Sequence, residues 1–295
     1  MGKLDVPGAS LYYEVRGSGP VLLLICGGIY DAAGYAGLAD LLADRYTVVT
    51  YDRRGNSRSP IDGPPERQRV ETHADDASRL LAEVADGPAH VFGNSSGAQI
   101  GLELAARHPG QVRALVAHEP PLLTLLPDAE HWEAVMADVE RAYRDGGAGP
   151  AMGTFGAALG MGGGEDAGSA EQGSAEQGPA EQGPAEQGPA EEQEPPSPEM
   201  LEMFARFERN TEFFVGYEVP GFGRYTPDVD ALRGSSVRIV PAAGEESAGE
   251  PPHRAALVLA ERLGTSAEIY PGDHGGFGPH AAAFAARLAE AFPVD

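Results

Sequence analysis

The feature that most constrains this chain is the pentapeptide Gly-Asn-Ser-Ser-Gly at residues 93–97. It follows a short apolar run at 89–92 and precedes a segment, 98–105, whose apolar residues recur at helical spacing. A G-x-S-x-G sequence in this context is typical of a sharp turn from a strand into a helix, which lifts the central serine above a sheet. The outer glycines are needed because a side chain there would collide across the turn. The sequence therefore predicts a tight turn with Ser95 at its tip.

Strand and helix patterns alternate in the first and last parts of the chain. Short apolar runs predict strands at 11–15, 21–25, 46–51, 89–92, 112–117, 237–240 and 267–270. Segments with helical spacing fall between or after them, at 33–43, 72–84, 98–105, 252–263 and 281–292. Strands separated by helices imply right-handed crossovers in one sheet. The expected fold class is α/β, with a mostly parallel, doubly wound sheet and helices on both faces.

The alternation lapses between residues 120 and 235. Helical patterns occur there at 129–143 and 198–214, and no convincing strand pattern appears. We expect a sheet core made of 1–119 and 236–295, with 120–235 inserted as a helical lid over the C-terminal edge of the sheet. In open α/β sheets, ligands bind at that edge.

A low-complexity segment lies inside the predicted lid, at 160–197. A glycine-rich stretch is followed by a five-residue repeat that begins as Gly-Ser-Ala-Glu-Gln at 168–172. The second copy has the same sequence, and the next three copies have proline in place of serine. The period of this repeat matches neither a solenoid nor a coiled coil. Because the segment has almost no apolar surface to bury, we expect it to be disordered, as a repeat-expanded surface loop rather than a binding element.

Composition narrows the classes of partner. The formal net charge is −24, which argues against nucleic acid and against an anionic membrane surface. Cys26 is the only cysteine, so no intrachain disulfide can form, and a reducing compartment is the simple inference. The N-terminus lacks the pattern of a signal peptide, and no apolar run reaches membrane-spanning length. We expect a cytoplasmic protein whose partner is a small-molecule substrate; the oligomeric state is left open.

Three further motifs give the chain a resemblance to a known family. They are Leu-Ile-Cys-Gly-Gly at 24–28, Tyr-Asp-Arg-Arg-Gly-Asn-Ser-Arg-Ser at 51–59, and Gly-Asp-His-Gly at 272–275. Together with the pentapeptide they resemble the oxyanion turn, the D-x-R-G-x-G-x-S loop and the histidine loop of the α/β-hydrolase superfamily. The resemblance covers about residues 8–118 and 236–292 and points to the branch with a serine nucleophile.

The chemistry of such a site needs a nucleophile, a base and an oxyanion hole. Ser95 is the candidate nucleophile by position, and His274, on a glycine-flanked loop after the last strand, is the candidate base. Backbone N–H groups of Ser96 and Gly28 are the expected oxyanion donors. Cys26 stands where the family usually has histidine; we expect a buried small hydrophobe there, not a nucleophile.

The acid of the triad departs from the commonest family pattern. After strand 237–240 the family usually has Gly-x-x-Asp, but here Ser247 holds the acid's place. A known family alternative puts the acid at the end of the strand that follows the serine's helix, where this chain has Glu119. We therefore favour Glu119 as the acid, with Glu246 or Glu245 as the alternative.

Six other histidines are weaker candidates for the base than His274. We expect His73, His131 and His253 to lie on surface helices. We assign structural roles to these three and to three others in strand or helix-end positions, His90, His108 and His118.

These residues predict a serine hydrolase that cleaves a carboxylic ester, thioester or lactone through an acyl-enzyme, with neither cofactor nor metal. Many Met and Phe residues in the predicted lid favour an apolar acyl or ring-bearing substrate. The alternatives are use of the same triad for C–C bond hydrolysis, perhydrolysis or a biosynthetic cyclisation, or a ligand-binding member of the fold without catalysis.

Overall fold

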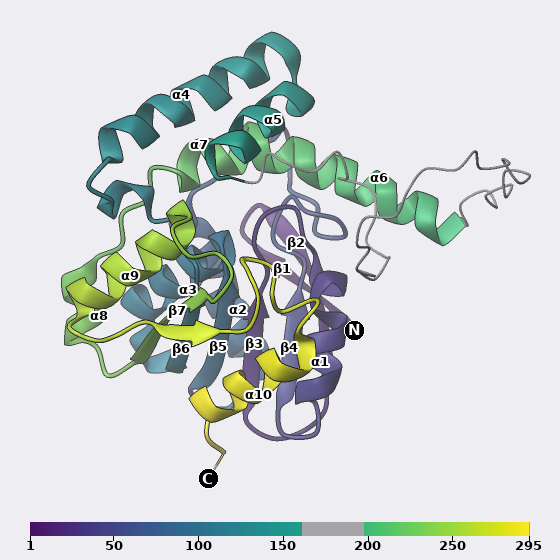
Figure 1. Cartoon of the computed structure of the whole chain (residues 1–295). Helices are drawn as coiled ribbons and strands as arrows, with labels where there is room; N and C mark the ends of the chain where they lie inside the picture. Colours follow the sequence, from purple (N-terminus) through teal and green to yellow (C-terminus); the bar gives the residue numbers. More distant parts are fainter. Residues whose placement is uncertain (161–197, 295) are drawn as a thin grey trace, which may run out of the picture.

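The computed structural model describes residues 1–160 and 198–294, and an eight-stranded sheet forms its centre (Figure 1). The strands are β1 (Gly2–Val6), β2 (Ala9–Arg16), β3 (Val21–Ile25), β4 (Thr47–Tyr51), β5 (Ala89–Asn94), β6 (Val112–His118), β7 (Arg238–Gly244) and β8 (Glu268–Tyr270). Their order is β1-β2-β4-β3-β5-β6-β7-β8. Pairing is antiparallel as far as β4 and parallel from β4 to β8.

Helices cover both faces of the sheet. In β3, Leu23 and Ile25 pack on one side and Leu22 and Leu24 on the other, because successive side chains of a strand alternate. The first side is covered by α2 (Val70–Val84), α3 (Ser96–Arg107), α8 (Val229–Gly234) and α9 (Pro251–Leu263), and the second by α1 (Ala36–Leu42) and α10 (Ala281–Ala291). The α/β class and the mostly parallel, doubly wound sheet are confirmed.

The main difference from the sequence prediction in the sheet is β1. It pairs antiparallel with β2, and Val6 is the one buried residue among its five. An edge strand of this kind lacks the continuous apolar run that identifies the central strands. The predicted helix at 33–43 also begins differently, as a short 3-10 helix over Ala32–Tyr35 before α1.

Between β6 and β7 the described residues form helices that lie beyond one end of the sheet (Figure 1). They are α4 (Ala129–Gly146), α5 (Ala148–Ala158), α6 (Pro198–Phe213), a π-helical segment (Phe214–Glu218) and α7 (Val219–Phe222). The inserted helical lid is thus present, whereas its bounds at 120–235 stay a prediction. Except for Gly160, the predicted low-complexity loop at 160–197 lies outside the residues that the structure describes.

A buried ion pair joins the lid to the core. Arg53, in the loop after β4, donates from Nη1 to Oε1 of Glu218 at 2.7 Å, and both side chains are fully buried. Arg53 also donates to the carbonyl of Gly28 at 2.5 Å, in the loop after β3. Asn210 of α6 adds a bond from its amide to the carbonyl of Ile29 at 2.8 Å. The position of the lid is therefore coupled to the loop that carries Gly28.

We expect Glu218→Gln to destabilise the fold strongly. The substitution keeps the shape of the side chain but leaves the Arg53 guanidinium buried without its counter-ion. Removing one partner of a buried pair costs about 3–5 kcal/mol. Urea unfolding measures this loss. As a control, Glu133→Gln breaks the pair with Arg224 at a side chain that is 60% exposed, and should cost less than about 1 kcal/mol. Equal losses in the two variants would contradict the coupling.

Candidate active site

Ser95 lies at the turn between β5 and α3 in a strained backbone conformation, with φ +55° and ψ −126°. The flanking glycines explain how the turn closes. A Cβ atom on Gly93 would lie 2.4 Å from the carbonyl oxygen of Gly97, and one on Gly97 would lie 2.1 Å from that of Ile25. Side chains at either position would prevent the close packing of β3, β5 and α3, so the sharp turn requires both glycines.

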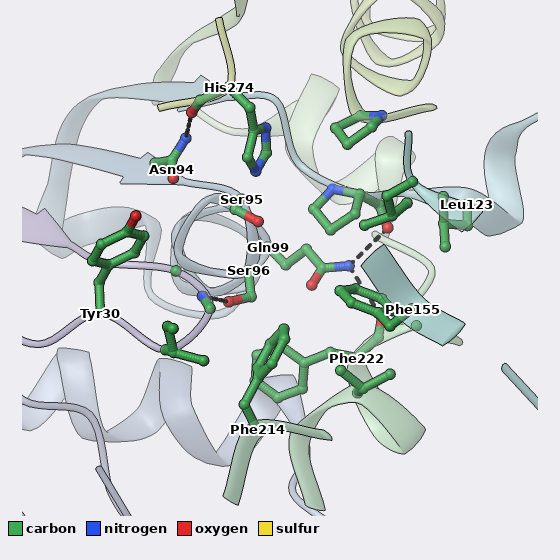
Figure 2. A pocket seen from close by; sticks show the side chains of 18 of the residues that line it. Tyr30, Asn94, Ser95, Ser96, Gln99, Leu123, Phe155, Phe214, Phe222 and His274 are labelled. Atoms are coloured by element: carbon green, nitrogen blue, oxygen red, sulfur yellow. Dashed lines mark hydrogen bonds between the residues drawn. The ribbon is translucent and has the colours of Figure 1, made fainter. Parts of the chain in front are cut away.

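His274 and Glu119 meet at the carboxyl end of the sheet. Nδ1 of His274 lies 2.6 Å from Oε2 of Glu119, although the two residues are far apart in sequence. The His274 loop is held by a bond from the Asn94 amide to the His274 carbonyl at 2.9 Å. In Figure 2 the imidazole of His274 points toward Ser95. Carboxylate, imidazole and serine thus lie in the order that proton transfer from a serine requires.

The Glu119 carboxylate is fully buried and is held from several sides. Its Oε1 accepts hydrogen bonds from the Gly244 N–H at 2.8 Å and from the Ser247 hydroxyl. Desolvation alone would raise the pKa of Glu119, but the hydrogen bond and charge of His274, followed by the charge of His118 and the Ser247 bond, lower that pKa to about 2. The serine at the customary acid position therefore supports the carboxylate of Glu119.

The alternative acids lie elsewhere. Glu245 and Glu246, in the loop after β7, have exposed side chains. Within residues 1–160 and 198–294, the carboxylate that is hydrogen-bonded to His274 is that of Glu119.

The two predicted oxyanion donors lie beside the serine. Gly28 has φ +54°, and its N–H donates to Oγ of Ser96 at 3.0 Å. The preceding Gly27 approaches the turn so closely that a Cβ atom there would lie 2.7 Å from Cβ of Ser95. Ser96 is the first residue of α3, where backbone N–H groups lack partners within the helix. The hydroxyl of Ser96 as a partner for Gly28 was not indicated by the sequence, which pointed only to the Ser96 backbone.

Cys26 precedes these glycines and is buried. Desolvation raises the pKa of its thiol to about 12, so the thiol is protonated at neutral pH. Its position favours packing under the loop and argues against a nucleophilic role.

A cavity of about 180 Å³ opens beside Ser95 and His274 (Figure 2). The core contributes Gly27, Gly28 and Gln99 to its lining. Most of the opposite wall is apolar and comes from the lid helices, through Met152, Phe155, Leu159, Phe214, Val219 and Phe222. The lid thus determines the shape of the space into which the serine faces.

Two histidine predictions are wrong. His73 and His253 lie on helices as expected, but both are buried, whereas His131 is exposed. His73 packs against the ring of Phe222, and burial lowers its pKa well below the usual range. His253 donates from Nδ1 to the Gly244 carbonyl at 3.1 Å, beside the Glu119 carboxylate. A single polar residue on the buried face of a helix gives no periodic signal, so sequence reasoning missed these contacts.

Two kinds of feature are absent from the described part of the chain. Residues 1–160 and 198–294 contain no group of three or more His, Cys, Asp or Glu side chains that could hold a metal ion. No helix in the same ranges is long and apolar enough to cross a membrane.

Comparison with known proteins identifies the family. A family model described as the alpha/beta hydrolase fold matches residues 20–224. The "Uncharacterized hydrolase YraK" of Bacillus subtilis (strain 168) is 39% identical over 293 residues, covering 97% of this chain and 94% of that protein. The chain therefore belongs to the α/β-hydrolase fold family, as the resemblance of its motifs implied.

Solved structures share the fold at low sequence identity. A thermophilic esterase from Thermogutta terrifontis superposes with a TM-score of 0.69 at 17% identity, covering 98% of this chain and 97% of that one. Est816, described as an N-acyl homoserine lactone degrading enzyme, superposes with a TM-score of 0.67 at 19% identity. The match covers 98% of this chain and 99% of that one. At these identities the likeness establishes the fold alone.

We expect Glu119 to make stability depend on acid pH. Its pKa falls from 4.5 to about 2 on folding, so its stabilisation is complete above about pH 4.5 and is lost as the pH falls toward 2. The shift corresponds to at most about 3 kcal/mol. Urea unfolding measures the free energy of unfolding at about pH 6 and about pH 3. Between these two pH values it should fall less in Glu119→Gln than in the wild type. Glu246→Gln, at an exposed side chain, should keep the wild-type dependence; an unchanged dependence in Glu119→Gln would refute the assignment.

Proposed function

We propose that this chain is a serine hydrolase that cleaves a carboxylic ester, thioester or lactone through an acyl-enzyme. One observation carries the proposal: the Glu119–His274 hydrogen bond stands beside a serine in a strained turn that faces an apolar cavity. Such an arrangement suits acyl transfer, since a base held by a carboxylate can take the proton of the serine.

The first half of the reaction forms the acyl-enzyme. Oγ of Ser95 attacks the substrate carbonyl carbon while Nε2 of His274 takes its proton. Glu119 holds the Nδ1–H of the imidazole and stabilises the imidazolium that results. The N–H groups of Gly28 and Ser96 donate to the developing oxyanion, and removing one such donor in other enzymes costs about 3–4 kcal/mol. The N–H of Gly28 donates to the Ser96 hydroxyl in the structure. To bind the oxyanion, this N–H must leave the hydroxyl or donate to both oxygens.

The second half releases both products. As the tetrahedral intermediate collapses, its C–O or C–S bond breaks and His274 returns the proton to the leaving alkoxide or thiolate. A water molecule then attacks the acyl-enzyme while His274 takes one of its protons. As the bond between the acyl carbon and Oγ of Ser95 breaks, His274 gives that proton to Oγ and the acid is released. With a lactone, the leaving hydroxyl stays attached to the acyl group, so one hydroxy acid is the product.

The cavity favours a small substrate. A volume of about 180 Å³ is below the roughly 300–1,000 Å³ of pockets for drug-sized ligands. Its apolar wall of lid side chains suits a short acyl chain or a ring. Two of the fold relatives are described as an esterase and as an N-acyl homoserine lactone degrading enzyme, which agrees with this bond class.

Covalent labelling tests the nucleophile. We expect a fluorophosphonate probe to modify Ser95 in the wild type, as located by peptide mass spectrometry, and short-chain p-nitrophenyl esters to be turned over. Ser95→Ala should lose both. Ser78→Ala removes a hydroxyl on α2, outside the cavity lining, and should behave as the wild type. Absence of both labelling and turnover in the wild type would sink the proposal.

Substitution of the acid tests the base–acid pair. Glu119→Gln should lower kcat by roughly 100-fold or more, because the imidazole loses the carboxylate that sets its tautomer. Glu246→Gln should change kcat by less than about twofold, as expected for a surface substitution. A large loss of kcat in Glu246→Gln with little change in Glu119→Gln would instead assign the acid to Glu246, in the loop after β7.

A further inference from the structure

Gln99 of α3 is fully buried and lines the cavity one helical turn after Ser95. Its Nε2 donates to the carbonyl oxygens of Pro121 at 3.1 Å and Phe222 at 3.0 Å. Because a carbonyl oxygen can only accept, these two bonds fix which end of the amide is the nitrogen. The carbonyl Oε1 of Gln99 must face the other way.

Oε1 of Gln99 has no hydrogen-bond donor among the residues that the structure describes, although the atom is buried. Such an acceptor is unfavourable, because it loses its hydrogen bonds to water without gaining one from the protein. In Figure 2 the Gln99 amide projects among Phe155, Phe214 and Phe222, with its nitrogen turned to the two carbonyls. It therefore supplies an oriented acceptor in a largely apolar space.

A purely structural role does not account for this arrangement. Bridging Pro121 and Phe222 uses only the nitrogen of the amide, and the buried oxygen has no partner within residues 1–160 and 198–294. Because Gln99 lines the cavity, a molecule bound there can donate the hydrogen bond that Oε1 lacks.

We propose that Gln99 determines specificity by accepting a hydrogen bond from an O–H or N–H of the substrate. The proposal rests on the serine hydrolase function above and narrows it to hydroxyacyl or amide-bearing esters and lactones. Ser95 immediately precedes α3, and the N–H of Gln99 donates to the Ser95 carbonyl at 3.3 Å, so the two residues are neighbours across the first turn. The donor accordingly lies within a few bonds of the carbonyl that Ser95 attacks, and the rest of the substrate contacts the apolar wall.

Matched substrates test the proposal on the wild-type protein. The set is methyl butanoate, methyl 3-methoxybutanoate, methyl 3-hydroxybutanoate and methyl N-acetylglycinate, with hydrolysis followed by pH-stat titration. The methoxy ester has the oxygen but lacks the donor. We expect kcat/KM for at least one donor-bearing ester to exceed that of both donor-free esters by roughly tenfold or more. The hydroxy and amide esters distinguish an O–H from an N–H donor.

The variant Gln99→Leu removes the acceptor at similar size. It should abolish the preference, so the ratio of kcat/KM for the donor-bearing ester to kcat/KM for methyl butanoate should fall to about 1. This ratio is the readout because the variant also removes the bonds to Pro121 and Phe222, a loss that affects all four esters alike. Fluorophosphonate labelling of Ser95 checks that the variant is folded and competent.

The two proposals fail in different ways. If the wild type cleaves all four esters without preferring a donor, the role of Gln99 is overturned whether or not the variant folds, and the hydrolase function stands. If the variant is labelled and keeps the preference, the Gln99 proposal is likewise overturned. If Ser95 is unlabelled and none of the esters is cleaved, the hydrolase function itself fails.

Discussion

The arrangement at the carboxyl end of the sheet depends on one buried charge, the carboxylate of Glu119. A carboxylate without contact to water is strongly unfavourable unless donors surround it. The donors come from three separate segments: the N–H of Gly244 at the end of β7, the hydroxyl of Ser247 in the following loop, and the imidazole of His274 after β8. The hydrogen bonds that stabilise the Glu119 charge therefore hold these segments together, and with them the imidazole near Ser95.

A second set of constraints connects the core to the lid. Gly27 and Gly97 let the loop after β3 approach the serine turn, and Arg53 links that same loop to Glu218 in the π-helical segment. The neighbouring lid residues Phe214 and Val219 line the cavity. Residues of the core can therefore perform the chemistry, while the lid, held by a buried ion pair, shapes the space for the substrate.

Local sequence patterns predicted the central strands and the serine turn well, because parallel strands are apolar throughout and the turn demands glycines at two positions. Glu119 could be singled out because Ser247 occupies the usual place of the acid. Three features could not be predicted: the burial of His253, the bond from Gly28 to the Ser96 hydroxyl, and the Gln99 oxygen that has no donor among the described residues. Each depends on contacts between segments that are distant in sequence, and a single polar residue carries no periodic signal.

We infer that the Glu119 carboxylate holds the Nδ1 proton of His274. Proton NMR observes that proton directly, because a short hydrogen bond to a carboxylate shifts its resonance strongly downfield and slows its exchange with water. We predict such a resonance, coupled to Nδ1 in protein with 15N-labelled histidine, in the wild type and in Glu246→Gln. It should be absent from His274→Ala and lost or moved far upfield in Glu119→Gln. A resonance that persists unchanged in Glu119→Gln would contradict the claim.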